Sequence, residues 1–568
     1  MSSSLPQNPA ERLDLSWSEL EAFTQDLLDR SLDEQSLPSW LMEWSDLSRL
    51  VYEVRERLYV AITVNTTDAK AEELYNRFLD GLYPAFRAAD QQLKEKLLTS
   101  RLEPEGFTVP LLNLRTEAAI FRQENLPLLS EELRLSTDYF KLIGAQTITW
   151  EGKEVTLSQL QPVYLEVDRE RRERAWHLEM ERRLRDRPAI NDQWYKLLEL
   201  RGKLAANAGM PDYRTYRWQQ MLRFDYTPED CYRFHDAIEQ IIVPVARRIY
   251  ERRRQRLGLT ELRPWDLWVD PFGRPPMRPY SSARELIEKT SAIFHRVDPA
   301  LGAYFDIMRN ENLLDLENRK GKAPGGYCTS FEVVKRPFIF MNGVGLHEDV
   351  LTLLHEGGHA FHVFEAARLP YIQQQHVGME FGEVASMAME LLSSPYLVNS
   401  QGGFYTEQEA ARARIEHLEQ AILFWPYMAV VDAFQHWAYE NPAAAAVPAN
   451  CDATWDALWG RFMPGVDWSG LDEARRTGWQ RKMHIFEVPF YYVEYGMAQL
   501  GAFQIWRNAL NDQAAAVSAY RRALALGGTV SLPQLYTTAG IRFAFDIDTL
   551  KRSVELGESK ISELEEVQ

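Results

Sequence analysis

Apolar residues recur at steps of three and four positions along most of the chain, and this spacing constrains its fold more than any other feature. Near the start the pattern is carried by two runs of residues: Leu20, Phe23, Leu27 and Leu28, then Leu74, Phe78, Leu82 and Phe86. A repeat of this period places apolar side chains on one face of an α-helix. After a turn-rich break at 103–106, the period returns from about 130 to 143. The sequence therefore predicts a mostly α protein, a large multi-helix body.

Short runs rich in β-branched and aromatic residues interrupt the helical pattern at two places. Residues 147–150 and 154–157 predict a small β-hairpin, because a three-residue link with a glycine joins them. Residues 327–331 and 337–341 predict a second small sheet. Proline and glycine gather at 263–279, which predicts a loop and a candidate domain boundary.

The charge balance excludes some classes of partner. Lys and Arg number 64 and Asp and Glu number 82, so the formal net charge is −18. Nucleic acids and anionic membrane surfaces require clustered cations, so we expect neither as a partner. No stretch approaches the roughly 18 consecutive apolar residues of a membrane span, and residues 1–17 lack the basic and apolar parts of a secretory signal. The three cysteines form no C-x-x-C pair, so we expect a cytoplasmic protein.

The chemistry is concentrated in a helix predicted from about 347 to 368. His355 and His359 are four positions apart, so their imidazoles project from one face and can hold a single tetrahedral ion. Glu356 is angled toward the open coordination position, where it can take a proton from a zinc-bound water. This is the H-E-x-x-H arrangement. The remaining histidines, His235 and His436 among them, have no such ligand spacing.

The context of this motif matters, because it arises by chance in roughly 2% of chains of this length. The predicted helix is apolar nearly all round, so buried polar side chains on it need partners. Gly357 and Gly358 lie within the helix, where each costs about 1 kcal/mol relative to alanine. Something must therefore approach the backbone closely, and packing against a neighbouring helix is the alternative to a functional reason.

Two histidines leave a catalytic zinc ion one protein ligand short of the usual three. The metzincin solution needs Gly at 362 and His at 365, but the sequence has His362 and Glu365. A second helix predicted at about 376–392 contains three candidate acids: Glu380, Glu383 and Glu390. Their spacing alone does not choose among them, and the two that are not ligands can orient imidazoles or satisfy buried donors.

A third group of polar side chains follows late in the chain. Pro489 can open a helix that places Tyr491 and Tyr495 on a common face, with Tyr492 one step round. An aromatic stripe of this kind is usually core. The competing interpretation is that phenols and His484 point at the zinc cleft and hydrogen-bond the oxyanion of a tetrahedral intermediate.

These segments resemble the thimet oligopeptidase-like metallopeptidases, and more closely their oligoendopeptidase F and Pz-peptidase branch. The matching motifs lie at 322–327, 349–362 and 383–386. The resemblance implies one zinc ion (Zn2+) per chain, bound by His355, His359 and Glu383, with Glu356 as the general base.

The same resemblance places a histidine and tyrosines from a late helix at the oxyanion. We favour His484, Tyr491 and Tyr495 for this role, with Tyr492 close behind. The resemblance also implies that a peptide borders an edge strand at three residues: Gly325, Gly326 and Tyr327.

The resemblance further implies two lobes that enclose a deep substrate channel, with the small sheets near the active site. We expect an N-terminal helical region at 1–200 and a catalytic region at 201–568 that holds the zinc helix, the ligand helix and the late Tyr/His helix. The predicted function is zinc-dependent endopeptidase hydrolysis of short unfolded oligopeptides. The alternatives are a carboxypeptidase or dipeptidyl carboxypeptidase with the same zinc site, or a non-catalytic, zinc-stabilised peptide-binding protein.

Overall fold

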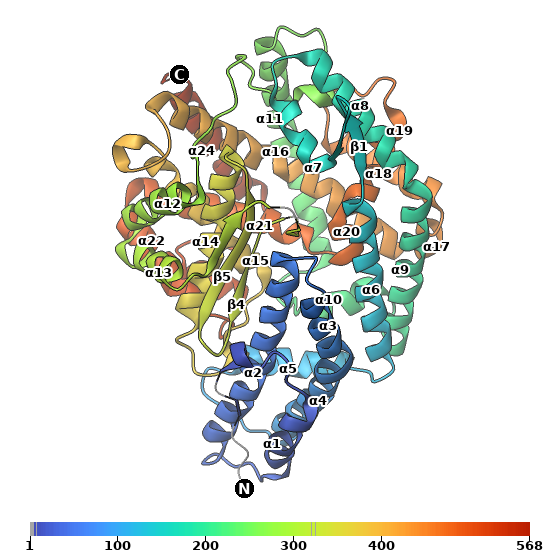
Figure 1. The fold of residues 1–568 in the computed structure, drawn as a ribbon, viewed down its shortest axis with the longest axis vertical. Coiled ribbons are helices and arrows are strands. Elements are labelled where there is room, and N and C mark those ends of the chain that lie inside the picture. Colours follow the sequence, from blue (N-terminus) through green and yellow to red (C-terminus); the bar gives the residue numbers. More distant parts are fainter. Residues whose placement is uncertain (1–4, 7, 320, 324, 568) are drawn as a thin grey trace. The chain divides into compact units, whose positions relative to one another are not determined.

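The structure is a computed structural model that describes residues 5–6, 8–319, 321–323 and 325–567. Pro324 of the 322–327 motif lies outside the described residues. Helices make up most of the chain and two small sheets interrupt them, which confirms the predicted fold class (Figure 1). Among the described residues, no helix combines the length and the apolar character needed to cross a membrane.

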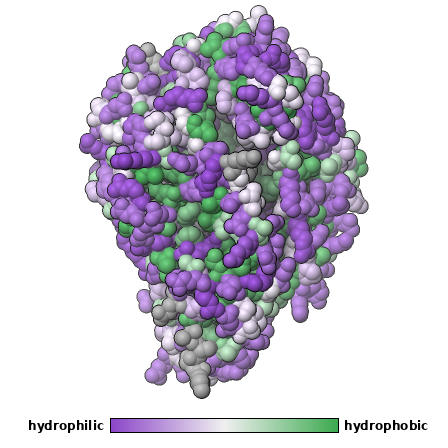
Figure 2. All heavy atoms as spheres, in the orientation of Figure 1, coloured by the Kyte–Doolittle hydropathy of each residue, from purple (hydrophilic) through white to green (hydrophobic). Residues whose placement is uncertain are grey.

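The chain divides into two compact units, each assembled from three stretches of sequence. Unit 1 comprises Met1–Ala119, Arg278–Ala411 and Gly501–Phe543, and unit 2 comprises Ile120–Met277, Arg412–Leu500 and Ala544–Gln568. Two long helices cross from one unit to the other: α16 (Glu407–Glu440) and α21 (Tyr492–Asn511). The visible face of the molecule in Figure 2 is mostly hydrophilic, as expected from the net charge of −18.

The helices of unit 1 are α1 (Trp17–Asp29), α2 (Leu37–Val64), α3 (Ala69–Arg77), α4 (Tyr83–Ser100), α5 (Thr108–Ile120), α12 (Ala283–Val297), α13 (Pro299–Asn310), α14 (His347–Ala366), α15 (Met379–Ser393), α22 (Gln513–Leu524) and α23 (Leu532–Thr538). The N-terminal helices of this unit bury their apolar faces against one another, as the apolar periodicity predicts. Trp40 and Trp44 are one turn apart on α2, each is 1% exposed, and their ring centroids lie 5.3 Å apart. Helix α5 falls in the stretch where the sequence showed no helical period.

Unit 1 also contains a three-stranded sheet of order β3-β5-β4, built from β3 (Leu314–Glu317), β4 (Tyr327–Phe331) and β5 (Arg336–Gly343). Strands β4 and β5 pair antiparallel, with Tyr327 opposite Phe340, as predicted for these two segments. Strand β3 pairs parallel to β5 and was not predicted, because its short run alternates leucine with acidic residues. The central strand β5 is buried on both faces, and α14 follows it and packs against the sheet (Figure 1).

The helices of unit 2 are α6 (Asn125–Gly144), α7 (Leu157–Leu160), α8 (Arg169–Arg185), α9 (Arg187–Asn207), α10 (Tyr213–Gln220), α11 (Pro228–Arg256), α17 (Pro442–Ala445), α18 (Pro448–Phe462), α19 (Asp472–Arg476), α20 (Met483–Glu487) and α24 (Ile547–Glu565). The expected hairpin is present as β1 (Thr147–Trp150) and β2 (Lys153–Thr156). Its two turn residues, Glu151 and Gly152, both have positive φ, at 50° and 81°, as a tight hairpin turn requires.

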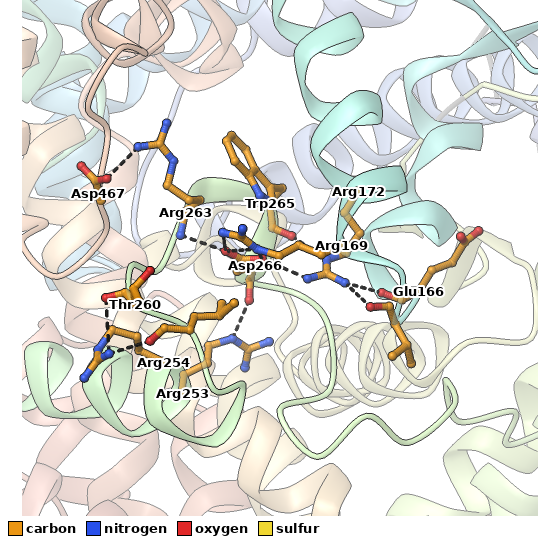
Figure 3. A network of polar contacts seen from close by, with 12 residues as sticks. Glu166, Arg169, Arg172, Arg253, Arg254, Thr260, Arg263, Trp265, Asp266 and Asp467 are labelled. Atoms are coloured by element: carbon orange, nitrogen blue, oxygen red, sulfur yellow. Dashed lines mark hydrogen bonds and ion pairs between the residues drawn. The ribbon is translucent and has the colours of Figure 1, made fainter.

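The predicted loop at 263–279 is fixed to the helices of unit 2 by a buried carboxylate. Asp266 is 0% exposed, and both of its oxygens accept hydrogen bonds from guanidinium groups of α8 (Figure 3). Arg172 donates to Oδ1 and Arg169 to Oδ2, each at 2.9 Å. Arg253 of α11 donates to the Asp266 backbone oxygen at 2.9 Å. Because burying a carboxylate is costly unless charged donors surround it, Arg169 and Arg172 stabilise the buried Asp266 side chain and so hold the loop against α8.

Candidate metal centre

The helix that carries the H-E-x-x-H motif begins and ends close to where the sequence predicts. Its first turn is closed by Asp349, whose Oδ2 accepts hydrogen bonds from the backbone N–H groups of Val344 and Leu346 at 2.9 and 2.8 Å. A carboxylate at this end also interacts favourably with the helix dipole. Helix α14 therefore begins shortly after the end of β5. The helix packs against β4 and β5, and its H-E-x-x-H motif lies beside the sheet of unit 1.

The two glycines of the motif exist for packing. A Cβ atom at Gly358 would lie 2.4 Å from the carbonyl oxygen of Ala385 and 2.5 Å from Cα of Ser386. A Cβ atom at Gly357 would lie 2.5 Å from Cζ of Phe294. Only glycine allows α15 to approach α14 this closely. The neighbouring-helix explanation therefore applies, and it has a functional consequence, because α15 carries the candidate acids.

Three potential ligands converge where α14 and α15 meet. Glu383 Oε2 lies 3.3 Å from His355 Nε2 and 3.4 Å from His359 Nε2. One ligand atom from each of the three residues lies within 4.8 Å of the others. The carboxylate is anchored by Ser386, whose hydroxyl donates to Glu383 Oε2 at 2.9 Å. Two imidazole nitrogens that face one carboxylate oxygen form the donor set of a catalytic zinc site.

The other two acids of α15 lie in different positions. Glu390 Oε1 is 2.6 Å from His355 Nδ1, on the side of the ring away from Glu383. A carboxylate there fixes the tautomer that leaves Nε2 available to a metal. Glu380 is 2% exposed and makes no described ion pair with either motif histidine. The structure thus separates three acids that sequence spacing could not distinguish.

The two histidines of the cluster keep part of their side chains exposed to solvent. A metal ion bound there could therefore have one coordination position open to water. The side chains of His355 and His359 are 23% and 19% exposed, whereas that of Glu383 is 4% exposed. Burial by itself would raise the pKa of the Glu383 carboxyl, but the two imidazoles outweigh it and hold that pKa well below its usual range. Two imidazole nitrogens and one carboxylate oxygen are a donor set that fits a zinc ion.

Two further side chains of α14 are buried beside the cluster. Glu356 is 7% exposed, and burial raises the pKa of its carboxyl above the usual range, although His355 and His359 oppose the shift. His362 is 8% exposed, and its Nε2 has no hydrogen-bond partner among the described residues. Burial lowers the pKa of His362 to about 4.

The late histidine and tyrosines form a cluster of their own in unit 2. His484 lies on α20, and its ring centroid is 4.9 Å from that of Tyr492 and 5.9 Å from that of Tyr495. The rings of Tyr491 and Tyr495 are 5.1 Å apart. Tyr492 is buried and Lys482 Nζ lies 3.8 Å from its ring centroid, whereas Tyr491 and Tyr495 are half-buried.

The helix of this cluster begins later than the sequence predicts. Pro489 does not open it, because Phe490 has a positive φ of 66° that turns the chain, and α21 starts at Tyr492. Tyr491 therefore precedes the helix, and Tyr495 belongs to its first turns. The four aromatic side chains are nevertheless brought together around this turn.

Of the expected substrate-bordering residues, Tyr327 begins β4, an edge strand of its sheet, and Gly325 and Gly326 directly precede it. The Tyr327 hydroxyl is 2.6 Å from Thr63 Oγ1 of α2, and its ring stacks on Phe340 at 4.8 Å. At Gly326 a Cβ atom would lie 3.3 Å from the Thr352 methyl carbon of α14. The Tyr327 side chain is thus committed to packing, and Gly325 and Gly326 present mainly backbone.

A family model described as peptidase family M3 matches residues 165–555 of the chain. An oligoendopeptidase F homolog of Lactococcus lactis is 23% identical over 368 residues, which cover 61% of this chain and 57% of the relative. The oligopeptidase PepF of Bacillus subtilis is 22% identical, with 60% and 50% coverage. The chain thus matches less than two thirds of the length of these relatives. A solved structure of Pz peptidase A with an inhibitor is 28% identical over 100% of both chains, with a TM-score of 0.91.

Proposed function

Because the chain belongs to peptidase family M3, we propose that it is a zinc-dependent endopeptidase that hydrolyses short, unfolded oligopeptides. The observation that carries the proposal is the convergence of His355, His359 and Glu383 beside the buried carboxyl of Glu356. The partly exposed imidazoles leave room for a water molecule and a substrate carbonyl, which a closed structural site would exclude.

In this proposal His355, His359 and Glu383 hold one zinc ion, which when bound supplies Lewis-acid activation of water and of the scissile carbonyl. Glu356 takes the proton of the attacking water and then passes it to the leaving amine. Glu390 is a positioning residue that keeps His355 in the required tautomer and orientation.

As the family resemblance implies, we propose that the cluster of His484, Tyr491, Tyr492 and Tyr495 stabilises the oxyanion. Tyr491 and Tyr495 keep exposed surface, so their hydroxyls are the first candidates to donate hydrogen bonds to a developing negative charge. His484 contacts these rings and supplies a further N–H donor. Tyr492 is the weaker candidate, since its ring is buried beneath Lys482.

The proposed peptide path passes Gly325 and Gly326 and reaches β4 at Tyr327, where a substrate strand could add to the sheet edge. We propose that two lobes enclose this path in a deep channel, which would exclude folded proteins. The division into an N-terminal helical region at 1–200 and a catalytic region at 201–568 is part of the same proposal. It is supported by the family match from 165 and by the position of every proposed site residue beyond 320. A cytoplasmic location is the companion proposal, supported by three cysteines that form no disulfide in the described residues.

A quenched-fluorescent peptide assay tests the proposed function. We expect internal cleavage of a peptide blocked at both ends, complete loss of cleavage after chelation, and recovery when zinc is restored. Mass spectrometry of the products separates the alternatives, because a carboxypeptidase or dipeptidyl carboxypeptidase requires a free C-terminus. Cleavage that persists in metal-free protein, or the absence of any cleavage with zinc bound, would refute the proposal.

A further inference from the structure

A second group of metal-ligating side chains lies in unit 2, and the proposed peptidase function does not use it. Cys231 and His235 are four positions apart on α11, and Asp432 and His436 are four positions apart on α16. Side chains with this spacing share a helix face. Each helix therefore presents a pair of potential ligands, and the two pairs meet in the interior of the unit.

The atoms of this group are arranged closely enough to share an ion. Cys231, Asp432 and His436 each offer one ligand atom within 4.8 Å of the other two. His436 Nε2 lies 3.4 Å from Asp432 Oδ2, and His235 Nε2 lies 2.9 Å from the same oxygen. All four residues are buried, with exposures of 0% for Cys231 and Asp432, 1% for His436 and 2% for His235.

Two atoms of the group have no hydrogen-bond partner among the described residues. These are Asp432 Oδ1 and His436 Nε2, which lie on the residues that converge with the cysteine. A buried carboxylate oxygen without a hydrogen bond is costly, on the order of 1–3 kcal/mol or more. A cation bound between Cys231, Asp432 and His436 would offset this cost.

The guanidinium of Arg214, a charged neighbour of the group, forms hydrogen bonds with other residues. Arg214 Nη1 carries two hydrogens, and its contacts include Glu440 and, at 3.0 Å, the Tyr232 hydroxyl. Tyr232 in turn donates to Glu440 at 2.6 Å. The contact from Arg214 Nη1 to His436 Nδ1 is longer, at 3.3 Å. The two hydrogens of Nη1 therefore go to Glu440 and Tyr232. His436 can then present Nε2 to an ion.

We propose that Cys231, Asp432 and His436 bind a second divalent transition-metal ion of the zinc class, with His235 holding the ligating carboxylate in place. The thiol gives up its proton to solvent when the ion enters, so a thiolate and a carboxylate balance the two positive charges of the ion. Sulfur, nitrogen and oxygen together favour zinc or cobalt over magnesium or calcium. The ion ties α11 to α16 and has a structural role, because the site is closed to substrate.

The sulfur ligand provides a direct test, since the proposed catalytic centre offers only nitrogen and oxygen. We would load the full chain with Co2+ and record the near-ultraviolet thiolate-to-cobalt charge-transfer band. We expect the band in the parent protein, and its loss in Cys231→Ser. The other two cysteines supply matched controls, and Cys328→Ser and Cys451→Ser should both keep the band.

A second variant separates this site from the catalytic one. In a His355→Ala, His359→Ala double variant, metal analysis should find one cobalt per chain where the parent binds two, and the thiolate band should remain. A cobalt-loaded parent that shows no thiolate band would overturn the proposal whatever the fold of the variants. A band that persists in Cys231→Ser, or that vanishes in the double variant, would overturn it as well.

Discussion

Two three-ligand clusters in this protein differ mainly in exposure. His355 and His359 in unit 1 keep side-chain exposures of 23% and 19%, whereas Cys231, Asp432 and His436 in unit 2 are at most 1% exposed. Both clusters are built from helix pairs with ligands four positions apart on one helix. Under our two proposals, the same arrangement of ligands on paired helices serves a catalytic role where water has access and a structural role where it does not.

The difference has a physical origin in the packing around each cluster. In unit 1, Gly358 lets α15 approach α14 so closely that Glu383 reaches both histidines, while the imidazole edges stay accessible. In unit 2 Asp432 is 0% exposed, and the rings of Tyr232 and Phe490 pack against His436. An open coordination position is available only in the first arrangement.

The largest effect should come from Glu356→Gln in the open cluster. Loss of the general base should lower kcat/KM by about 10²–10⁴-fold, while the metal content stays the same. Glu348→Gln, the same change at an exposed position of α14, serves as the control and should retain activity. Full turnover in a metal-loaded Glu356→Gln protein would show that Glu356 is not the general base of the open cluster.

Next in size is the effect of Tyr495→Phe in the aromatic cluster. Removal of one oxyanion donor should reduce kcat by about 10²–10³-fold and leave KM nearly unchanged. Tyr195→Phe, at a position 51% exposed in the same unit, should have no effect. An unchanged kcat would assign Tyr495 to core packing and transfer the proposed role to Tyr491.

A smaller effect is expected from Glu390→Gln. Without the carboxylate at His355 Nδ1, zinc affinity at the open cluster should fall by about 10–100-fold, as measured by competition with a chromophoric chelator. Glu380→Gln on the same helix is the matched control and should retain the affinity. If the two variants bind zinc equally well, the carboxylate does not position His355.

The smallest effect concerns pH and His362. Its pKa is about 4 in the folded chain and 6.5 in its ordinary state, so the unfolded chain binds this proton at a higher pH than the folded chain does. The free energy of unfolding therefore falls as the pH drops through 6.5. His362 alone should lower it by about 1.4 kcal/mol at pH 5.5 relative to pH 8. Denaturant unfolding at a series of pH values gives the free energy of unfolding of the parent and of His362→Gln. The contribution of His362 is the difference between the two curves. Parallel curves would show that His362 is not buried in its neutral form.

Sequence reasoning located the helices of the open cluster within a few residues. It predicted 347–368 and 376–392, and the structure has His347–Ala366 and Met379–Ser393, because capping residues and apolar period mark these helices locally. The third ligand was not derivable from spacing, since it depends on the register of α15 against Gly358, a contact between separate segments.

The features that sequence reasoning missed share a physical cause. Strand β3 escaped notice because Asp315 and Glu317 interrupt its apolar run, and parallel pairing with β5 stabilises it. The buried cluster escaped because each helix supplies only two of its residues, and His235 and Asp432 are 197 positions apart. The late start of α21 follows from the positive φ of Phe490, an unusual conformation for a residue with a large side chain.

The most direct measurement for the account is anomalous diffraction at the zinc absorption edge from crystals of the zinc-loaded protein. The account predicts a peak bound by His355 Nε2, His359 Nε2 and the Glu383 carboxylate, with one coordination position facing solvent. A protein with zinc-dependent peptidase activity that shows no peak between these three side chains would contradict it.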